Sequence, residues 1–325
     1  MSSPGDQTAD RPTTTSVRKS SKLGGFLRRL IKEKPLGAIC AVVVLLLFFT
    51  GIFADVLAPF GMNELNPSES LFPPSPRHPL GTDNLGRDVL SRIIYGARIS
   101  MIVGLAATTL SVGISVVIGV LTGFLGGVFD LVVQRLVDAW MSFPGIVILI
   151  TAASILGPGL WQVILILGIL YGIGDSRIIR GAVIAIKENT YVDAAVTIGC
   201  PPWRIVLRHI LPHIMPPTIV LFTTSIPAVI MDEAALSFLG LGVPPPYPSW
   251  GGMLSGVGRR FLLRAPWLAI WPGLSLSIVV YSVNIFGDAV RDILDPRLRG
   301  GLGRYRDLAK EELVKREEAI PEASD

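Results

Sequence analysis

Six long apolar stretches alternate with polar segments along the chain. The stretches at 99–124 and 268–286 contain no charged residue at all. An α-helix of about 20 apolar residues is long enough to cross the hydrocarbon core of a bilayer. The pattern therefore predicts an all-α, polytopic transmembrane helical bundle of six spans. These spans are 36–57, 99–124, 131–156, 160–177, 214–231 and 268–286.

The polar segments divide the chain further. Residues 1–22 are rich in Ser, Thr, Pro and charge and are predicted to form a disordered tail. Residues 23–58 combine a basic amphipathic stretch with the first span, and 59–97 form a long loop outside the membrane. The region 98–290 holds the other five spans as a core domain, and 291–325 form a second polar tail.

Composition supports a membrane protein. Only 17% of the 325 residues are charged, whereas a soluble domain carries about a quarter. The net charge is +4, but the basic residues flank apolar spans, which favours a membrane over nucleic acid as the partner. Cys40 lies inside a span and Cys200 in a polar loop, so no disulfide is expected.

The basic residues also predict the orientation. An even number of spans places both termini on one side of the membrane. The two tails and the loop between the fourth and fifth spans hold 21 Lys and Arg residues, against 7 in the two long loops on the opposite side. Basic segments stay in the cytoplasm, so both termini of this plasma or inner membrane protein are predicted to be cytoplasmic.

The most informative segment is the cytoplasmic loop 182–212, which we call the knob. Residues 183–198 are predicted to form one helix, ended by Gly199 in the left-handed conformation. Pro201 and Pro202 suit the first turn of a second helix. The apolar face of this second helix is predicted to carry Trp203, Val206, Leu207 and Ile210. Two short helices joined at a glycine corner form a rigid protrusion that suits mechanical contact with a cytoplasmic partner.

The knob resembles the coupling motif of the permeases of binding-protein-dependent ABC importers. That motif is Glu-Ala-Ala, three residues, Gly, nine residues, a hydrophobic residue, any residue and Leu-Pro. Asp193 stands at the Glu position, and His209 at the hydrophobic position. The resemblance implies that the knob docks on an ATPase subunit and that Asp193 meets a basic residue there. The residues assigned to coupling are Asp193, Ala194, Ala195, Gly199, Arg204, Leu211 and Pro212.

Other segments narrow the resemblance. Residues 79–92 are similar to the extracytoplasmic signature of the second, C-type permease subunit of dipeptide and oligopeptide importers. Segments 233–242 and 287–297 resemble that family as well, and the likeness covers 23–299. The family includes importers of nickel, glutathione and oligosaccharides, which leaves the substrate open. The signature residues are Gly81, Thr82, Asp83, Gly86, Arg87 and Asp88.

The resemblance implies the type I ABC importer permease fold and a set of partners. These are a homologous second permease subunit, two cytoplasmic ATP-binding subunits, an extracytoplasmic solute-binding protein and membrane lipid. ATP and Mg²⁺ would be bound by the ATPase subunits, so no cofactor, metal or enzymatic role is expected of this chain. Two rival classes stay open. A stand-alone secondary transporter would use an ion gradient and give the knob no role, and a membrane scaffold or receptor would transport nothing.

Three local patterns imitate other sites. The segment from Gly81 to Asp88 has the spacing of a P-loop, but Arg87 replaces the lysine and Asp88 would repel phosphate. The helical spacing of apolar residues in 89–94 instead predicts a short helix on the outer face. His209 and the histidine four residues later have zinc-helix spacing, but Pro212 interrupts the helix, which favours a surface pair.

Charged residues within the spans form the last candidate set. Charge inside a membrane is costly, so each such residue needs a partner or water. Arg135 and Asp138 are three residues apart and are predicted to share a helix face. We interpret the set as pairs between helices near the membrane interfaces, with lining of the pathway as the alternative. The candidates are Asp138, Asp175, Arg177 and Glu233.

Small residues recur at helical spacing in two spans. Gly119, Gly123 and Gly127 are four residues apart, as are Gly168 and Gly172. Such spacing lets helix backbones approach closely in lipid, which predicts a tight helix pair. The alternative is that glycine is simply frequent in membrane helices.

Overall fold

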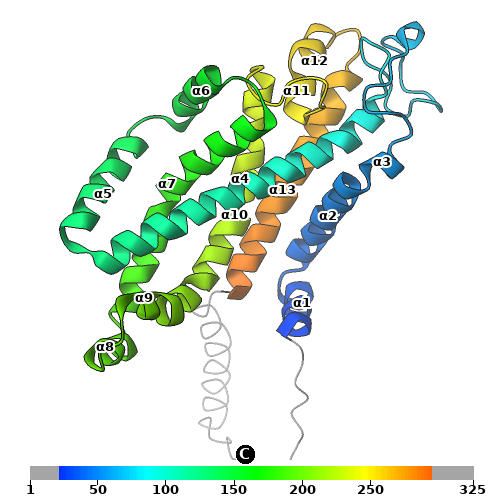
Figure 1. Cartoon of the computed structure of the whole chain (residues 1–325). Helices are drawn as coiled ribbons and strands as arrows, with labels where there is room; N and C mark the ends of the chain where they lie inside the picture. Colours follow the sequence, from blue (N-terminus) through cyan, green and yellow to red (C-terminus); the bar gives the residue numbers. More distant parts are fainter. Residues whose placement is uncertain (1–21, 295–325) are drawn as a thin grey trace, which may run out of the picture.

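The computed structural model describes residues 22–294 and is helical throughout that range, apart from loops and one isolated bridge between Thr82 and Asp88. Nearly all of the predicted tail 1–22, and all but the start of the tail 291–325, lie outside the described residues. Figure 1 labels the helices along the chain. They are α1 (Lys22–Glu33), α2 (Pro35–Ile52), α3 (Ala54–Leu57), α4 (Val89–Leu125), α5 (Gly127–Met141), α6 (Gly145–Leu156), α7 (Leu160–Lys187), α8 (Thr190–Thr197), α9 (Pro202–Ile205), α10 (Leu211–Phe238), α11 (Trp250–Leu254), α12 (Gly256–Arg260) and α13 (Trp267–Leu294).

Five helical segments of the described chain are long and apolar enough to cross a membrane: α2, α4, α7, the segment Pro202–Phe238 and α13. The pair α5 and α6 meets the same test but is bent by 86° at its break. With that pair counted as one broken span, the six predicted spans are confirmed.

The bend corrects the prediction of one continuous helix over 131–156. The helix stops at Met141, and Ser142, Phe143 and Pro144 form the break. Proline has no N–H for the helix ladder and disfavours helical geometry in the residue before it. A mid-span proline is tolerated in some membrane helices, but here the chain turns instead.

The start of α4 is a second correction. The apolar residues 89–94 do not form a separate short helix, because they are the first turns of the 37-residue helix α4. No helix breaker ends the run before Ile99, and Gly96 leaves room for a neighbour. A Cβ atom at Gly96 would lie 2.7 Å from Nε1 of Trp250, so glycine at this point permits close packing of α11.

Helices α4 and α7 form the most extensive pair in the described chain. A Cβ atom on Gly119 would lie 2.7 Å from Cβ of Ile179, and one on Gly172 would lie 2.7 Å from Cβ of Ile114. The Ser115 hydroxyl donates to the Gly172 carbonyl at 2.9 Å across the same interface. The glycine repeats therefore mark a tight helix pair, except for Gly127, which lies in the turn into α5 with open space around it.

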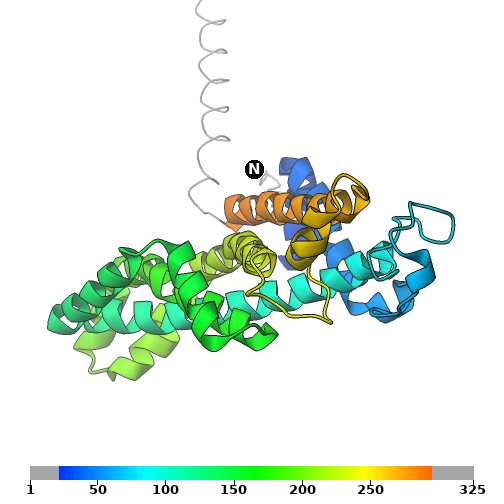
Figure 2. The same ribbon diagram turned by 90° about the horizontal axis from the view of Figure 1, so that it is seen from above.

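The remaining spans pack beside this pair. Figure 2 shows α2 and α13 on one side of the molecule and α5 to α7 on the other, with α4 extending past both groups. Leu47 of α2, Ile230 of α10 and Val279 of α13 share a buried cluster with Trp250. This arrangement leaves the outward faces of α2 and α5 exposed, with their many apolar side chains.

The bundle has two distinct ends (Figure 1). One carries α1, the knob and the last turns of α13. Lys34 Nζ lies 2.6 Å from Asp292 Oδ2, which joins the first and last helices there. The opposite end carries the loops 58–88 and 239–266, which we call the cap.

Candidate functional sites

The knob begins where α7 ends. The predicted helix over 183–198 is wrong as one unit, because α7 stops at Lys187 and α8 starts at Thr190. The Asn189 side-chain amide donates to the carbonyls of Ala185 and Ile186 at 3.1 and 2.9 Å. Carbonyls at a helix C-terminus lie beyond the regular helix hydrogen bonds, so the amide, together with the Asn189 N–H that also donates to the Ile186 carbonyl, stabilises the break.

The corner of the knob is confirmed at Gly199, whose φ is +76°. The Gly199 N–H donates to the Val196 carbonyl at 2.9 Å, and the Cys200 N–H donates to the Ala195 carbonyl at 3.0 Å. This pair of hydrogen bonds is the Schellman arrangement that ends a helix at a left-handed residue. The corner is therefore a defined, hydrogen-bonded turn that presents α8 and α9 in fixed directions.

The second helix of the knob starts at Pro202, as predicted, and continues through a π-helical turn at Val206–Ile210 into α10. The residues predicted to share one apolar face of this helix do not lie on the same side. Ile210 is fully buried, whereas Trp203 and Leu207 are 65% and 57% exposed. A π-helical turn contains an extra residue, so it rotates the following side chains away from the α-helical register.

The knob has both a buried side and an exposed side. Val192, Ala195 and Ile205 are buried in one cluster with Val183 of α7 and Ile214 of α10, which ties the knob to two spans. Four large apolar side chains point outward: Val196, Ile198, Trp203 and Leu207. Large exposed apolar side chains gathered on one short segment are typical of an interaction site. Among the residues that the sequence predicts to couple, Asp193, Ala194, Gly199, Arg204 and Pro212 are exposed, Leu211 is half-buried and Ala195 is buried.

The two histidines near the knob make aromatic and backbone contacts. The Tyr191 ring stacks on the His213 ring at 5.3 Å, and His213 Nδ1 lies within hydrogen-bonding distance of the His209 carbonyl. No group of three or more His, Cys, Asp or Glu in the described part of the chain is placed to hold a metal ion. These side chains fasten α8 to the start of α10.

At the cap, the signature loop packs its polar side chains inward. Thr82, Asp83 and Asp88 are all at most 5% exposed. Gly86, with φ of +73°, lies so close to Asn66 that a Cβ atom would fall 1.7 Å from the Asn66 carbonyl oxygen. The polar groups of the loop are thus used within the cap, and Gly86 permits close contact between the loop and the segment at Asn66.

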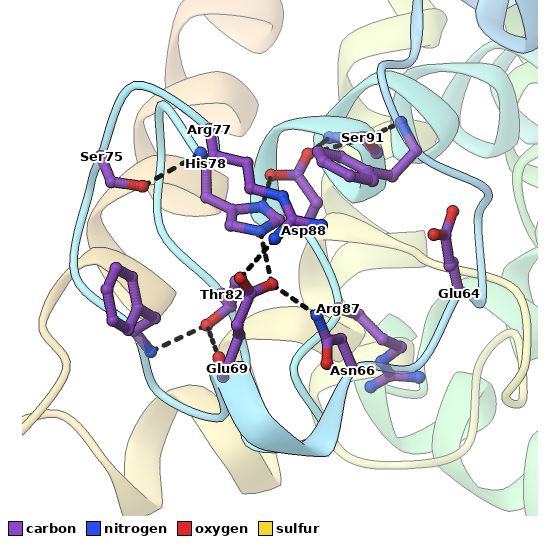
Figure 3. Close-up of polar contacts among 12 residues, drawn as sticks. Glu64, Asn66, Glu69, Ser75, Arg77, His78, Thr82, Arg87, Asp88 and Ser91 are labelled. Carbon is purple, nitrogen blue, oxygen red and sulfur yellow. Dashed lines mark hydrogen bonds and ion pairs between the residues drawn. The ribbon is translucent and has the colours of Figure 1, made fainter.

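His78 lies at the centre of this network (Figure 3). Its Nδ1 is 2.9 Å from Asp88 Oδ1, and its Nε2 is 3.1 Å from Glu69 Oε2. The Phe60 ring stacks on the imidazole at 4.7 Å. Sequence reasoning missed His78 and Glu69, because no spacing rule links loop residues 9 and 10 positions apart.

Asp88 also starts the longest helix. Its second oxygen accepts hydrogen bonds from the backbone N–H and the hydroxyl of Ser91, both at 2.7 Å. This is an N-cap, which satisfies donors at the first turn of α4. Further along α4, Arg98 Nη2 lies 2.8 Å from Asp55 Oδ2 of α3.

Two ion-paired groups of charged residues join α5 to α7. Asp138 of α5 contacts Arg177 of α7, and Arg135 Nη1 lies 3.1 Å from the same carboxylate. Arg180 donates to Asp130 from two nitrogens, at 2.6 and 2.5 Å. The sequence analysis missed this second bridge between α5 and α7, because the two residues are 50 positions apart.

Three further acidic residues belong to the spans: Asp175 of α7, and Asp232 and Glu233 of α10. The Tyr171 hydroxyl donates to Asp232 at 2.8 Å and joins α7 to α10. Glu233 is 1% exposed and accepts from the Ser237 hydroxyl at 2.7 Å, and the Ser249 hydroxyl also faces this carboxyl. One oxygen of Asp175 is buried without a hydrogen bond among the described residues.

Comparison with known proteins places this geometry in a family. A family model described as "binding-protein-dependent transport system inner membrane component" matches residues 115–300. The dipeptide transport system permease protein DppC of Alkalihalophilus pseudofirmus is 37% identical over 83% of this chain and 88% of its own length. The glutathione transport system permease protein GsiD of Pectobacterium atrosepticum is 36% identical over 84% and 91%.

A third relative and one solved structure complete the comparison. The probable D,D-dipeptide transport system permease protein DdpC of Escherichia coli is 34% identical over 88% of this chain and 97% of its own length. A chain of the inward-facing methionine ABC transporter MetNI superposes with a TM-score of 0.51 at 18% identity, over 63% of this chain and 96% of that one. At that identity the likeness supports the fold alone.

Proposed function

Since the chain belongs to the family of binding-protein-dependent transport system inner membrane components, we propose that it forms half of the translocation pathway of an importer for dipeptides or oligopeptides. It is a permease subunit of an ATP-binding-cassette transporter, and in this family ATP is bound by separate ATPase subunits. The other half of the pathway is a homologous second permease subunit. Relatives named for dipeptide transport support the peptide substrate, and the glutathione relative is the alternative.

The exposed side of the knob is the observation that carries this proposal. Ile198 is 83% exposed at the glycine corner, beside the exposed carboxylate of Asp193. An exposed apolar surface with charged side chains around it, among them the Asp193 carboxylate, fits a cleft on a partner that offers a basic residue. We assign that partner as the ATPase, with two such subunits in the assembly. The coupling residues Ala194, Ala195, Arg204, Leu211 and Pro212 shape or support the same surface.

The orientation follows from the two ends of the bundle. The knob end also holds α1 and the end of α13, which carry Arg28, Arg29, Lys32 and Arg291, and the knob itself adds Lys187, Arg204 and Arg208. We place this end in the cytoplasm and the cap outside, facing the solute-binding protein. In this arrangement 23–58 form the amphipathic helix and first span, 59–97 an outer segment that includes the start of α4, and 98–290 the core, with α13 ending at Leu294.

The packing of the knob supplies the route for coupling. Val192 and Ile205 pack in one cluster with Val183 of α7 and Ile214 of α10. When the ATPase pair closes, each knob moves with it and displaces the inner ends of both spans. The bundle then opens outward and receives solute from the docked binding protein. Asp175, Glu233 and the pair Asp138–Arg177 hold or line the moving helices.

Reconstitution tests the proposal. The complete set of subunits in vesicles is expected to take up labelled dipeptide only with binding protein and ATP. Excess unlabelled glutathione, Ni²⁺ or oligosaccharide is not expected to compete. Uptake driven by an ion gradient through this chain alone would instead support a secondary transporter.

Cysteine labelling tests the orientation separately. In a variant without Cys40 and Cys200, cysteines introduced at Ser68 or Ser255 of the cap are expected to react with an impermeant reagent on intact cells. A cysteine at Thr197 of the knob is expected to stay unlabelled until the cells are opened. The reverse pattern would overturn the orientation.

A further inference from the structure

The cap encloses a cavity of about 470 Å³. Its walls come from the signature loop, the start of α4, the loop 243–249, α11 and the first turn of α13. Pro244, Pro245 and Met253 supply apolar surface, and Ser249 and Tyr247 supply hydroxyl groups. Pockets of this size and mixed lining are typical of small-molecule sites.

The charges at one wall of the cavity do not balance. Arg87 and Arg92 both line it, and Asp83 is the acidic residue that lines it with them. Asp83 Oδ2 lies 2.6 Å from Nε of Arg87 but 3.9 Å from Nε of Arg92. Its other oxygen already accepts the backbone N–H groups of Leu85 and Arg87, at 2.8 and 3.0 Å. One carboxylate with its acceptors in use therefore faces two guanidinium groups.

Arg92 is the less satisfied of the two arginines. The residue is 9% exposed, yet its side chain makes a single hydrogen bond to the described chain, a long one of 3.5 Å to the Met62 carbonyl. A guanidinium has five N–H donors, and burying them without acceptors is costly. Arg87 donates to Asp83 through Nε, so its two terminal nitrogens are not bonded to that carboxylate. The cavity wall thus presents free donors and one surplus positive charge.

We propose that the cap cavity binds a carboxylate group between Arg87 and Arg92. A guanidinium matches a carboxylate in a planar, two-bond arrangement, and such charged hydrogen bonds are stronger where water is excluded. A single surplus charge fits a singly charged carboxylate better than a phosphate with two charges. Tyr247 lines the same cavity and is exposed, so its hydroxyl can bond the remainder of the bound group, whereas the buried Ser249 hydroxyl already accepts the Gly252 N–H.

The carboxylate has two possible sources. One is a free solute, such as the C-terminal carboxylate of a peptide. The other is an acidic side chain of the docked binding protein. The inference deepens the proposed function, because the cavity opens at the end that we assign to the outside. The carboxylate site does not depend on the knob, so this inference and the proposed coupling role of the knob can fail independently.

The test uses the assembled permease pair in lipid nanodiscs. The ligands are N-acetyl-alanyl-alanine and its C-terminal amide, which differ only in the carboxylate. The acid is expected to bind, and the amide to bind about tenfold or more weakly, as the loss of charged hydrogen bonds predicts. The variants R87Q and R92Q are expected to weaken binding of the acid by about the same factor. R98Q is the matched control, since Arg98 lies on α4 but pairs with Asp55 outside the cavity.

A further variant guards against a folding defect. Ser255 lines the cavity, and S255W narrows it while leaving both arginines in place. This variant is also expected to bind the acid more weakly, while its thermal unfolding midpoint stays unchanged. A second arm measures the affinity of the solute-binding protein for the same nanodiscs.

The outcomes separate the sources. Selective binding of the acid, lost in R92Q and kept in R98Q, supports a free solute. An acidic side chain of the binding protein is supported by a different result. The acid then does not bind, and the binding protein has lower affinity for the R87Q and R92Q permeases but not for the R98Q permease. Equal binding of acid and amide, or no effect of either arginine in both arms, would overturn the inference. A normal result for ATP-driven uptake in that case would leave the proposed function standing.

Discussion

His78 Nδ1 lies 2.9 Å from Asp88 Oδ1, and Asp88 at the same time caps the first turn of α4. A buried imidazole therefore connects the loops of the cap to the longest span of the bundle. Asp88 is 4% exposed and His78 is 3% exposed, so neither can exchange its partner for water. The cap is held as one unit with α4 and not as a loose surface loop.

Replacing Asp88 with alanine is expected to loosen the cap. D88A removes the N-cap, worth about 1 kcal/mol, and leaves the buried His78 ring short of a partner, at a further cost of about 1–3 kcal/mol. The thermal unfolding midpoint in detergent is expected to fall accordingly. R77Q is the control, because Arg77 is exposed and its ion pair with Glu69 contributes less than about 1 kcal/mol. Equal midpoints for D88A and the native chain would contradict the assignment.

Gly199→Val tests the corner of the knob. A Cβ atom there meets nothing within 4 Å, so the cost lies in the backbone alone, at about 1–2 kcal/mol for a left-handed residue. We expect the valine to redirect α9 and to lower solute uptake per ATP hydrolysed in vesicles. Gly181→Val is the matched control, because Gly181 also has open space around it and lies within α7 without a positive φ. A normal coupling ratio and normal ATPase affinity for G199V would remove the knob from the mechanism.

Charge reversal at Asp193 tests the electrostatic part of the docking. Asp193 is exposed and forms no ion pair in the part of the chain that the structure describes, so D193R leaves the fold unchanged. We expect weaker binding of the ATPase, measured by pull-down, and partial rescue when the facing basic residue of the ATPase is made acidic. Glu188→Arg, an exposed reversal just before α8, is the control. Equal losses in both variants would point to a general charge effect.

The bridge between Asp130 and Arg180 is expected to hold α5 against α7. The side chains are 16% and 30% exposed, and R180Q is expected to cost roughly 1–3 kcal/mol, with the lower part of that range favoured by partial solvent screening. The swapped pair D130R/R180D is expected to recover much of this loss. Spin-label distances between α5 and α7 would report the change, and an unchanged distance in R180Q would show that packing alone positions α5.

Gly119 is expected to be the least tolerant position of the tight helix pair. A side chain there would meet Ile179 and the Ser176 carbonyl at 2.7 Å, so α4 and α7 would have to separate. G119V is therefore expected to reduce the yield of folded protein in the membrane fraction. G113V lies on the same helix with open space at its Cβ position and serves as the control. Equal yields would mean that the two helices are not held at this distance in the membrane.

The amino-acid sequence by itself determined the features that depend on local chemistry. A helix in lipid must satisfy its own backbone hydrogen bonds, so the apolar stretches alone located the six spans. Gly199 was predictable for a similar reason, because a left-handed helix end strongly favours glycine. The spacing of Asp193, Gly199 and Pro212 along one segment was sufficient to indicate the family, since a motif within one loop needs no knowledge of packing.

Tertiary structure decided what depends on neighbours distant in the chain. Pro144 marked a weak point, but only the packing of α5 and α6 decided that the span would bend there. Likewise, Asp130 meets Arg180 because α5 lies against α7. Arg87 and Arg92 line one cavity with residues of α10, α11 and α13 because these distant segments converge at the cap. Side-chain partners across 50 positions leave no periodic trace in a sequence, because their contact is created by the approach of helices rather than by spacing along one.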